Sequence, residues 1–156
     1  MHPESDEQLL ERIRAGDTHA FARLYERYKG RLYAYCCRLM RNDSLAEDAV
    51  HNAFLKIHAG VHSVNSPRAF SLWMFRIARN EALMILREKK KTVEPDEDAI
   101  WDDDTPLDIL ARKEDHECIT HLLGQLSTVY REVIVLREFE QLSYAEIAEV
   151  TGTTVS

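Results

Sequence analysis

Residues 66–91 read SPRAFSLWMFRIARNEALMILREKKK and follow the period of an amphipathic helix. Ser66 is a candidate N-cap, and Pro67 stands in the first turn, where a missing N–H has no helical partner to lose. The apolar positions that recur at intervals of three and four are Phe70, Trp73, Met74, Ile77, Ala78 and Leu83. This stretch therefore predicts one long helix with a buried face, which runs out into a basic end.

The residues before this helix also have helical spacing. A short apolar stripe at 9–13 ends at Gly16, which suits the left-handed position after a helix. Asp17 can cap a second helix, whose apolar positions share one face as far as residue 39. A third helix is expected to open with a capping box of Ser44 and Glu47 and to end near residue 60.

The rest of the chain predicts a linker and a second, smaller helical domain. Residues 92–105 read TVEPDEDAIWDDDT, with seven carboxylates and no base, and such a segment cannot bury enough apolar surface to order itself. Helices are expected at about 107–123, 127–139 and 143–150, and no strand pattern occurs. We therefore expect an all-α protein with domains at 1–91 and 106–156, joined by an acidic linker at 92–105.

Charge is distributed unevenly along the chain, whose net charge is -7. Residues 68–91 carry seven bases against two acids, whereas residues 105–156 carry nine acids against four bases. A basic helix before an acidic stretch suggests a polyanion-binding surface in an otherwise acidic protein. The polar N-terminus, the lack of a long apolar run and the three cysteines predict a cytoplasmic protein that does not insert into a membrane.

The last residues, LSYAEIAEVTGTTVS (142–156), have the pattern of a helix-turn-helix. Ser143 and Glu146 form a second predicted capping box, and Gly152 can supply the tight turn. A further helix would begin near Thr153, yet the sequence stops at Ser156. We expect a shortened form of a longer polypeptide, and therefore weak binding to duplex DNA.

Three blocks together resemble the extracytoplasmic-function (ECF) sigma factors of bacterial RNA polymerase. AEDAVHNAFLKIH (46–58) is similar to region 2.2, residues 66–91 are similar to regions 2.3 and 2.4, and residues 126–156 are similar to region 4. The blocks occur in the family's order and spacing over residues 6–156. The resemblance implies a non-enzymatic subunit that joins core RNA polymerase, recognises promoter DNA and helps to melt it, commonly under the control of a cognate anti-sigma factor.

The resemblance also implies a surface for core polymerase on the predicted third helix. Its candidate residues lie away from the buried stripe and are Asp48, His51, Asn52, Leu55 and Lys56. Many family members have a Gln-Glu pair where this chain has His51 and Asn52, so one carboxylate is missing here. A solvated helix face without a partner is the alternative interpretation of these residues.

For the minus-ten promoter element, the resemblance implies contacts from the connector and the long helix. The candidates are His62, Asn65, Arg68, Arg76, Arg79, Asn80, Arg87, Lys89, Lys90 and Lys91. Bases of this kind neutralise phosphates, and Asn80 can present a donor and an acceptor to a base edge. Of the two aromatic residues on this helix, we expect Trp73 to be core, while Phe75 remains a candidate stacking platform.

For the minus-thirty-five element, the candidates are in the helix-turn-helix: Ser143, Tyr144, Thr153, Thr154 and Ser156. The acidic linker could thread a basic channel of the polymerase, as the family implies, or act only as a solubilising spacer. Two alternatives to a sigma factor stay open at this point. One is a helical adaptor that acts only through protein partners such as an anti-sigma factor, and the other is an ordinary helix-turn-helix repressor.

Metal and cofactor sites are not expected. The sets His116/Cys118/His121 and His58/His62 have spacings that a metal could use on a helix, but neither supplies four ligands. No constellation of a nucleophile and a base, and no glycine-rich phosphate loop, occurs in the sequence. The residues thus favour a binding protein over an enzyme.

Overall fold

A computed structural model of the 156-residue chain describes residues 3–64, 66–92 and 122–152, with the backbone alone at 91 and 92. Every regular element in these ranges is helical, as expected. The elements are α1 (Asp6–Arg14), α2 (Thr18–Met40), α3 (Asp43–Gly60), η1 (Val61–Ser63), α4 (Pro67–Thr92), α7 (Thr128–Ile134), η2 (Val135–Phe139) and α8 (Tyr144–Thr151). Residues 122–125 form a further helical turn. The predicted acidic linker lies outside the described residues.

The beginnings of α1 and α2 follow from local side-chain hydrogen bonds. Ser5 and Gln8 form a reciprocal capping box at α1, a Ser-x-x-Gln signal that our sequence reading missed. Gly16 has φ +94°, a conformation that glycine adopts without strain, and it turns the chain into α2. The carboxylate of Asp17 accepts hydrogen bonds from the N–H groups of His19 and Ala20, so the predicted cap of α2 is confirmed.

The predicted capping box at Ser44 and Glu47 is wrong. The cap is Asn42, whose side-chain oxygen accepts a hydrogen bond from Leu45 N at 3.0 Å. Arg41 takes the left-handed conformation (φ +56°), which ends α2 and leaves Asn42 extended and able to cap. The third helix therefore begins at residue 43, two positions earlier than a cap at Ser44 allows.

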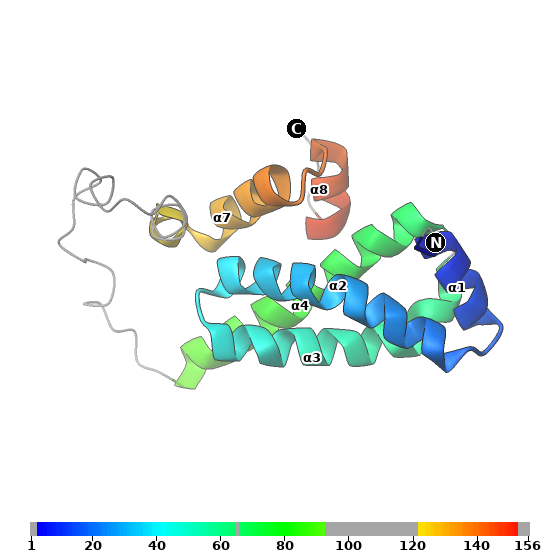
Figure 1. The fold of residues 1–156 in the computed structure, drawn as a ribbon. Coiled ribbons are helices and arrows are strands. Elements are labelled where there is room, and N and C mark those ends of the chain that lie inside the picture. Colours follow the sequence, from blue (N-terminus) through cyan, green and yellow to red (C-terminus); the bar gives the residue numbers. More distant parts are fainter. Residues whose placement is uncertain (1–2, 65, 93–121, 153–156) are drawn as a thin grey trace.

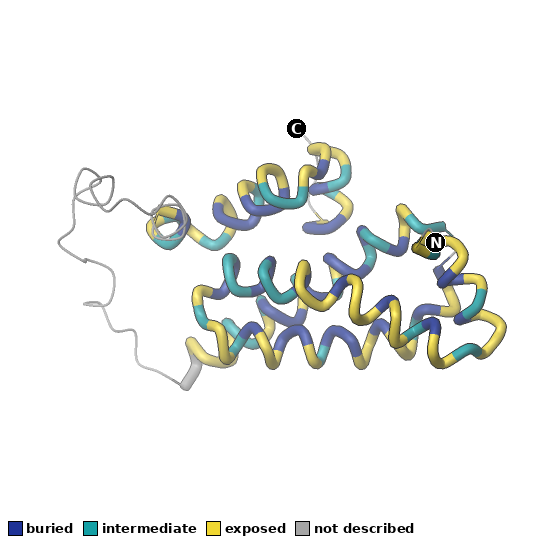
Figure 2. The backbone as a smooth tube through the Cα atoms, viewed as in Figure 1, coloured by how far each residue is buried: buried dark blue, intermediate teal, exposed yellow. Residues whose placement is uncertain are grey.

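The core of the first domain lies between α2, α3 and α4 (Figure 2). Phe75 is fully buried, and its ring meets Tyr35 edge to face at 5.5 Å, so it is a core residue and no stacking platform for a base. Trp73 is half-buried against the core, close to Gly60. A Cβ at Gly60 would lie 2.8 Å from the Trp73 ring, so the close approach of α3 and α4 requires glycine there.

The connector after α3 is less polar than its sequence suggests. Val61 and Val64 are both buried, and the guanidinium of Arg14 donates a hydrogen bond to the Val64 carbonyl. His62 stays exposed between them. Ser66 caps α4 as predicted, because its Oγ accepts a hydrogen bond from Ala69 N at 3.1 Å. Asn65 lies outside the described residues.

The second domain has the predicted helix-turn-helix start. Ser143 and Glu146 form the predicted capping box of α8, and Gly152 ends the helix with φ +71°. Before α8, the helix from Thr128 widens into a π turn, with Glu140 N bonded to Val135 O five residues earlier. Buried side chains of this part are Leu136, Leu142, Ile147 and Val150.

The buried face of α7 differs from the prediction. The apolar residues Val133, Ile134 and Leu136 predict a packing face on this helix, but Ile134 is 37% exposed. Arg131 and Glu132 occupy the inward positions instead, together with Val135. These two charged residues are buried because each has partners across the interface between the domains, which a pattern of apolar residues cannot reveal.

The two domains pack against each other, with α7 beside α2 and α8 beside α4 (Figure 1). Helix α3 lies on the opposite side of the first domain. None of the helices in the described ranges is long and apolar enough to span a membrane. Cys36 and Cys37 are both free thiols, and burial raises the pKa of Cys36 to about 12.

Candidate polymerase and promoter interfaces

The outward face of α3 is open, as the sequence suggested. Asp48, His51 and Leu55 are exposed, and 60% of the apolar Leu55 surface meets solvent. Asn52 is half-buried beside them. Lys56 is exposed but paired, since its ammonium group contacts the buried carboxylate of Glu81 on α4. Three of the five predicted residues thus form an accessible strip, and Lys56 also neutralises a buried acid.

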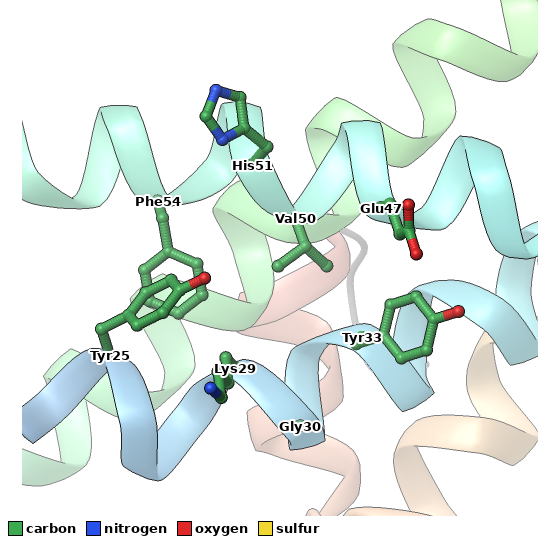
Figure 3. Close-up of a pocket in the computed structure, with 8 residues that line it drawn as sticks. All are labelled: Tyr25, Lys29, Gly30, Tyr33, Glu47, Val50, His51 and Phe54. Atoms are coloured by element: carbon green, nitrogen blue, oxygen red, sulfur yellow. The ribbon is translucent and has the colours of Figure 1, made fainter.

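A groove of about 410 Å³ runs beside this strip, between α2 and α3 (Figure 3). The close-up shows Val50 and Phe54 pointing from α3 toward α2, while His51 points away along the rim. The ring of Tyr25 meets Phe54 at 4.6 Å, and the Lys29 ammonium lies 5.6 Å from the Tyr25 centroid. The groove therefore combines an aromatic wall with two charged residues: Lys29, which is paired with Glu26, and Glu47.

Our sequence reading missed the contribution of α2 to this groove. The period of apolar residues in α2 includes Tyr25 and so predicts that it is buried, yet it is 39% exposed. Tyr33, eight residues further along α2, lines the same groove. A hydrogen bond with Cys37 is the main cause that raises the pKa of Tyr33 to about 12, so its hydroxyl is neutral at physiological pH. Two tyrosines two helical turns apart were the signal available in the sequence.

The outer side of α4 carries the predicted basic residues in two different states. Arg76, Asn80, Arg87 and Lys90 are exposed. Lys89 is exposed as well, and the side chain of Lys91 lies outside the described residues. Arg68 and Arg79 are engaged by the second domain, which the sequence did not predict.

Both engaged arginines pair with carboxylates. The guanidinium of Arg68 contacts Glu146 on α8, with Nε 3.1 Å from Oε1. This hydrogen bond, together with one from the backbone N–H of Ser143, lowers the pKa of Glu146. Arg79 is only 19% exposed in its side chain and pairs with Glu132 of α7, whose side chain is 5% exposed.

Two further arginines join the domains near the other end of the interface. Arg31 of α2 donates a hydrogen bond to Glu140 at 2.9 Å, and the Glu140 side chain is 6% exposed. Arg131 of α7 is buried without a carboxylate partner among the described residues. It donates to four carbonyl oxygens: Leu123 at 2.7 Å, Leu39 at 2.8 Å, Leu126 at 2.9 Å and Gly124 at 3.4 Å. The carbonyl of Leu39 belongs to α2, so Arg131 ties the second domain to the first.

At the helix-turn-helix, Ser143 and Tyr144 are exposed at the start of α8. The Arg137 guanidinium lies 4.8 Å from the Tyr144 ring centroid, in a cation–π contact. Thr153, Thr154 and Ser156 lie outside the described residues, so the expected second helix of the motif is not described.

No cluster of three or more metal-ligating side chains occurs within residues 3–64, 66–92 and 122–152. His58 packs edge to face against the Phe21 ring at 4.7 Å. The set His116/Cys118/His121 lies outside the described residues. The described surface therefore offers binding faces, with no metal centre.

Comparisons with known proteins identify both domains. The profile of sigma-70 region 2 matches residues 24–92, and the profile of sigma-70 region 4 matches residues 116–156. The chain is 30% identical to the ECF RNA polymerase sigma factor SigW of Bacillus subtilis, over 94% of this chain and 84% of that protein. It is 31% identical to the ECF RNA polymerase sigma-E factor of Haemophilus influenzae, over 97% and 86%.

A solved structure has the same arrangement. The structure of CnrH in complex with the cytosolic domain of CnrY matches with a TM-score of 0.68 and 25% identity, over 97% of this chain and 85% of that chain. Sequence and fold therefore agree over nearly the whole chain. Together they show that this protein belongs to the sigma-70 family and, within it, to the ECF sigma factors.

Proposed function

We propose that this sigma factor binds core RNA polymerase through the outward face of α3 and reads the minus-ten element through the outer side of α4. The observation that carries this division is the placement of the two surfaces. Helix α3 lies away from the second domain (Figure 1), whereas Arg68 and Arg79 of α4 pair with carboxylates of that domain. Membership of the family makes the chain a transcription initiation factor and not an enzyme.

The α3 surface has the composition of a protein-binding site. Leu55 provides an exposed apolar anchor, and the groove beside it presents Tyr25, Tyr33 and Lys29. Aromatic side chains next to a concave surface contribute most of the binding energy in protein interfaces. His51 and Asp48 then form the polar rim of this surface. Because His51 and Asn52 replace the Gln-Glu pair of many family members, the rim is expected to differ in its specificity for the polymerase.

The α4 surface has the composition of a nucleic-acid site. Arg76 and Arg87 are exposed bases that can neutralise phosphates, and Asn80 is an exposed amide that can bond to a base edge. The other proposed contacts are His62, Asn65, Arg68, Arg79, Lys89, Lys90 and Lys91. Binding that depends on phosphates weakens steeply as the salt concentration rises.

The division of the chain follows from these roles. We assign residues 1–91 to core and minus-ten binding, residues 92–105 to an acidic linker, and residues 106–156 to a helix-turn-helix for the minus-thirty-five element. In the last domain, Ser143, Tyr144, Thr153, Thr154 and Ser156 are the proposed DNA contacts. The protein would act in the cytoplasm, where the polymerase is.

We also propose a protein regulator of the anti-sigma type. CnrH was solved with the cytosolic domain of CnrY, which is another protein. In this chain, Val129 and Tyr130 of α7 are 66% and 67% exposed, and a helix that presents such apolar side chains suits a protein partner.

The test of this function is a double replacement on α4. Arg76→Ala with Asn80→Ala removes two exposed side chains that have no core role, so the fold should survive. We expect core binding to stay within two-fold of wild type (about 0.4 kcal/mol), while open-complex formation on a promoter selected from a randomised library is lost. Arg23→Ala, an exposed base on α2 with the same charge change, is the control.

Loss of core binding in the α4 variant would contradict the proposed division. Normal promoter melting by that variant would contradict the assignment of α4.

A further inference from the structure

The ion pairs between the two domains have one polarity. Arg31, Arg68 and Arg79 come from the first domain, and their partners Glu140, Glu146 and Glu132 come from the second. Nowhere in the described ranges does an ion pair of opposite polarity join the two domains. The second domain thus presents a row of anions to a basic surface, as a nucleic-acid backbone would.

Burial is also unequal within the pairs. The side chains of Glu132 and Glu140 are 5% and 6% exposed, whereas those of Arg79 and Arg31 are 19% and 48% exposed. A carboxylate that is removed from water and paired holds its arginine strongly, because separating the pair would leave a buried charge. Arg68 and Glu146 are more exposed, so that pair contributes less.

Two arginine contacts that involve no carboxylate also join the domains. The Arg131 guanidinium reaches the Leu39 carbonyl at the end of α2. Nearby, the Arg38 guanidinium lies 4.0 Å from the Phe139 ring centroid, in a second contact between the domains. The docked state is therefore a packed interface reinforced by charge. Two of its carboxylates contact Arg68 and Arg79, which we propose as DNA-binding residues.

We propose that the second domain is a built-in inhibitor of promoter binding, in which Glu132 and Glu146 occupy Arg79 and Arg68 in place of DNA phosphates. This inference rests on the proposed role of α4. Docking of the second domain and binding of DNA by α4 then compete, because Glu132 and Glu146 occupy N–H donors of Arg79 and Arg68 that a phosphate would use, and α8 packs against this side of α4. The α3 strip stays accessible in the docked state, so the closed molecule can meet the polymerase before it can bind DNA.

The test removes the three carboxylate charges without changing side-chain shape. In the full chain, Glu132→Gln, Glu140→Gln and Glu146→Gln are combined; glutamine at 146 preserves the capping box of α8. The matched control combines Glu11→Gln, Glu138→Gln and Glu149→Gln, three exposed residues whose replacement changes the net charge equally. The control is needed because any loss of negative charge favours DNA binding.

Two readouts are taken on both variants and on wild type. The first is the affinity for a fluorescent single-stranded DNA 20-mer of mixed sequence, and the second is the radius of gyration from small-angle scattering. If the open state is a minor population, the apparent affinity is reduced by its fraction. We expect the interface variant to bind at least about ten-fold more tightly than the control, with a larger radius of gyration.

Each outcome decides a separate point. A variant that stays as compact as wild type and binds DNA like the control overturns the inhibitory role, and leaves the polymerase assay of the α4 variant unaffected. A variant that opens without gaining DNA affinity also overturns it, and shows that the covered face is no DNA surface. The single replacement Glu146→Gln, at an exposed pair, should shift both readouts in the same direction by less, even if the triple variant fails to fold.

Discussion

The outward face of α3 and the outer side of α4 belong to the same helical bundle, yet the second domain contacts the α4 side and lies away from α3 (Figure 1). On α3, Leu55 and His51 meet solvent. On α4, Arg68 and Arg79 are taken by carboxylates of the second domain. A surface can therefore have the residues that suit a ligand and still be covered in the folded protein. On α4 this happens because the second domain supplies negative charge, as the ligand would.

The largest expected effect comes from Arg131, which lies on neither face and ties the second domain to α2. Arg131→Met removes hydrogen bonds to four carbonyls, including that of Leu39, and leaves a buried site without its donor. We expect a loss of about 3 kcal/mol in the free energy of unfolding, and roughly 10 °C in Tm. Thermal unfolding followed by circular dichroism measures it.

Arg131→Lys is the control for charge. It should recover only part of the loss, since a single ammonium cannot reach all four carbonyls from one position. An unchanged Tm in Arg131→Met would contradict a structural role for the guanidinium.

The two ion pairs at the α4 interface differ in burial and should differ in strength. Glu132→Gln breaks a pair whose carboxylate is buried and whose arginine is 19% exposed, so it should lower the free energy of unfolding by about 2 kcal/mol. Glu146→Gln breaks an exposed pair and keeps the capping box, so its effect should be close to zero. Urea unfolding of the two variants gives the ranking. Equal effects would mean that burial does not set the strength of these pairs.

On the open face, stability and function should separate. Leu55→Asp places a charge where 60% of the side chain is already exposed, so the free energy of unfolding should change by no more than about 0.5 kcal/mol. Core RNA polymerase should bind about ten-fold more weakly, as expected for loss of an apolar anchor. Fluorescence anisotropy with labelled sigma factor measures the affinity. Full affinity would exclude Leu55 from the core interface.

The smallest effect is a dependence on pH. The hydrogen bond from Arg68, and then that from Ser143 N–H, lower the pKa of Glu146 below its ordinary value of 4.5. The docked state therefore gains stability from this carboxylate above pH 4.5, and loses that gain as the pH falls through the lowered pKa. Scattering between pH 7 and pH 3.5 should show a step in wild type that Glu146→Gln diminishes. An identical profile in that variant would argue against the contribution of Glu146.

Much of the architecture was predictable because local chemistry determines it. Asp17, Ser66 and Ser143 are caps that the sequence states directly, and Gly152 supplies the left-handed residue that the turn needs. The cap of α3 was predicted at Ser44 and lies at Asn42. Both residue types cap helices, and the two are only two positions apart. Only the backbone conformation of Arg41 decides between them.

The interface between the domains was not predictable in the same way. The period of apolar residues placed Ile134 inside and gave no reason to bury Arg131 or Glu132. Those charges are buried because they pair with Leu39 O and Arg79. These partners lie 92 and 53 residues away in the chain, so a local pattern cannot predict them. The charge asymmetry between residues 68–91 and 105–156 was interpreted as a polyanion-binding surface, and the pairing of the two parts was not predicted.

The most direct test of the occupied α4 face needs neither DNA nor polymerase. Arginines of the full chain are modified with phenylglyoxal, and the rate at each site is read by mass spectrometry. Arg76, which is exposed on the same helix, serves as the internal reference for Arg79. We predict that Arg79 reacts far more slowly than Arg76 in wild type and approaches the rate of Arg76 in the Glu132→Gln, Glu140→Gln, Glu146→Gln variant. Equal rates at the two arginines in wild type would contradict the account, because the α4 face would then be as open as that of α3.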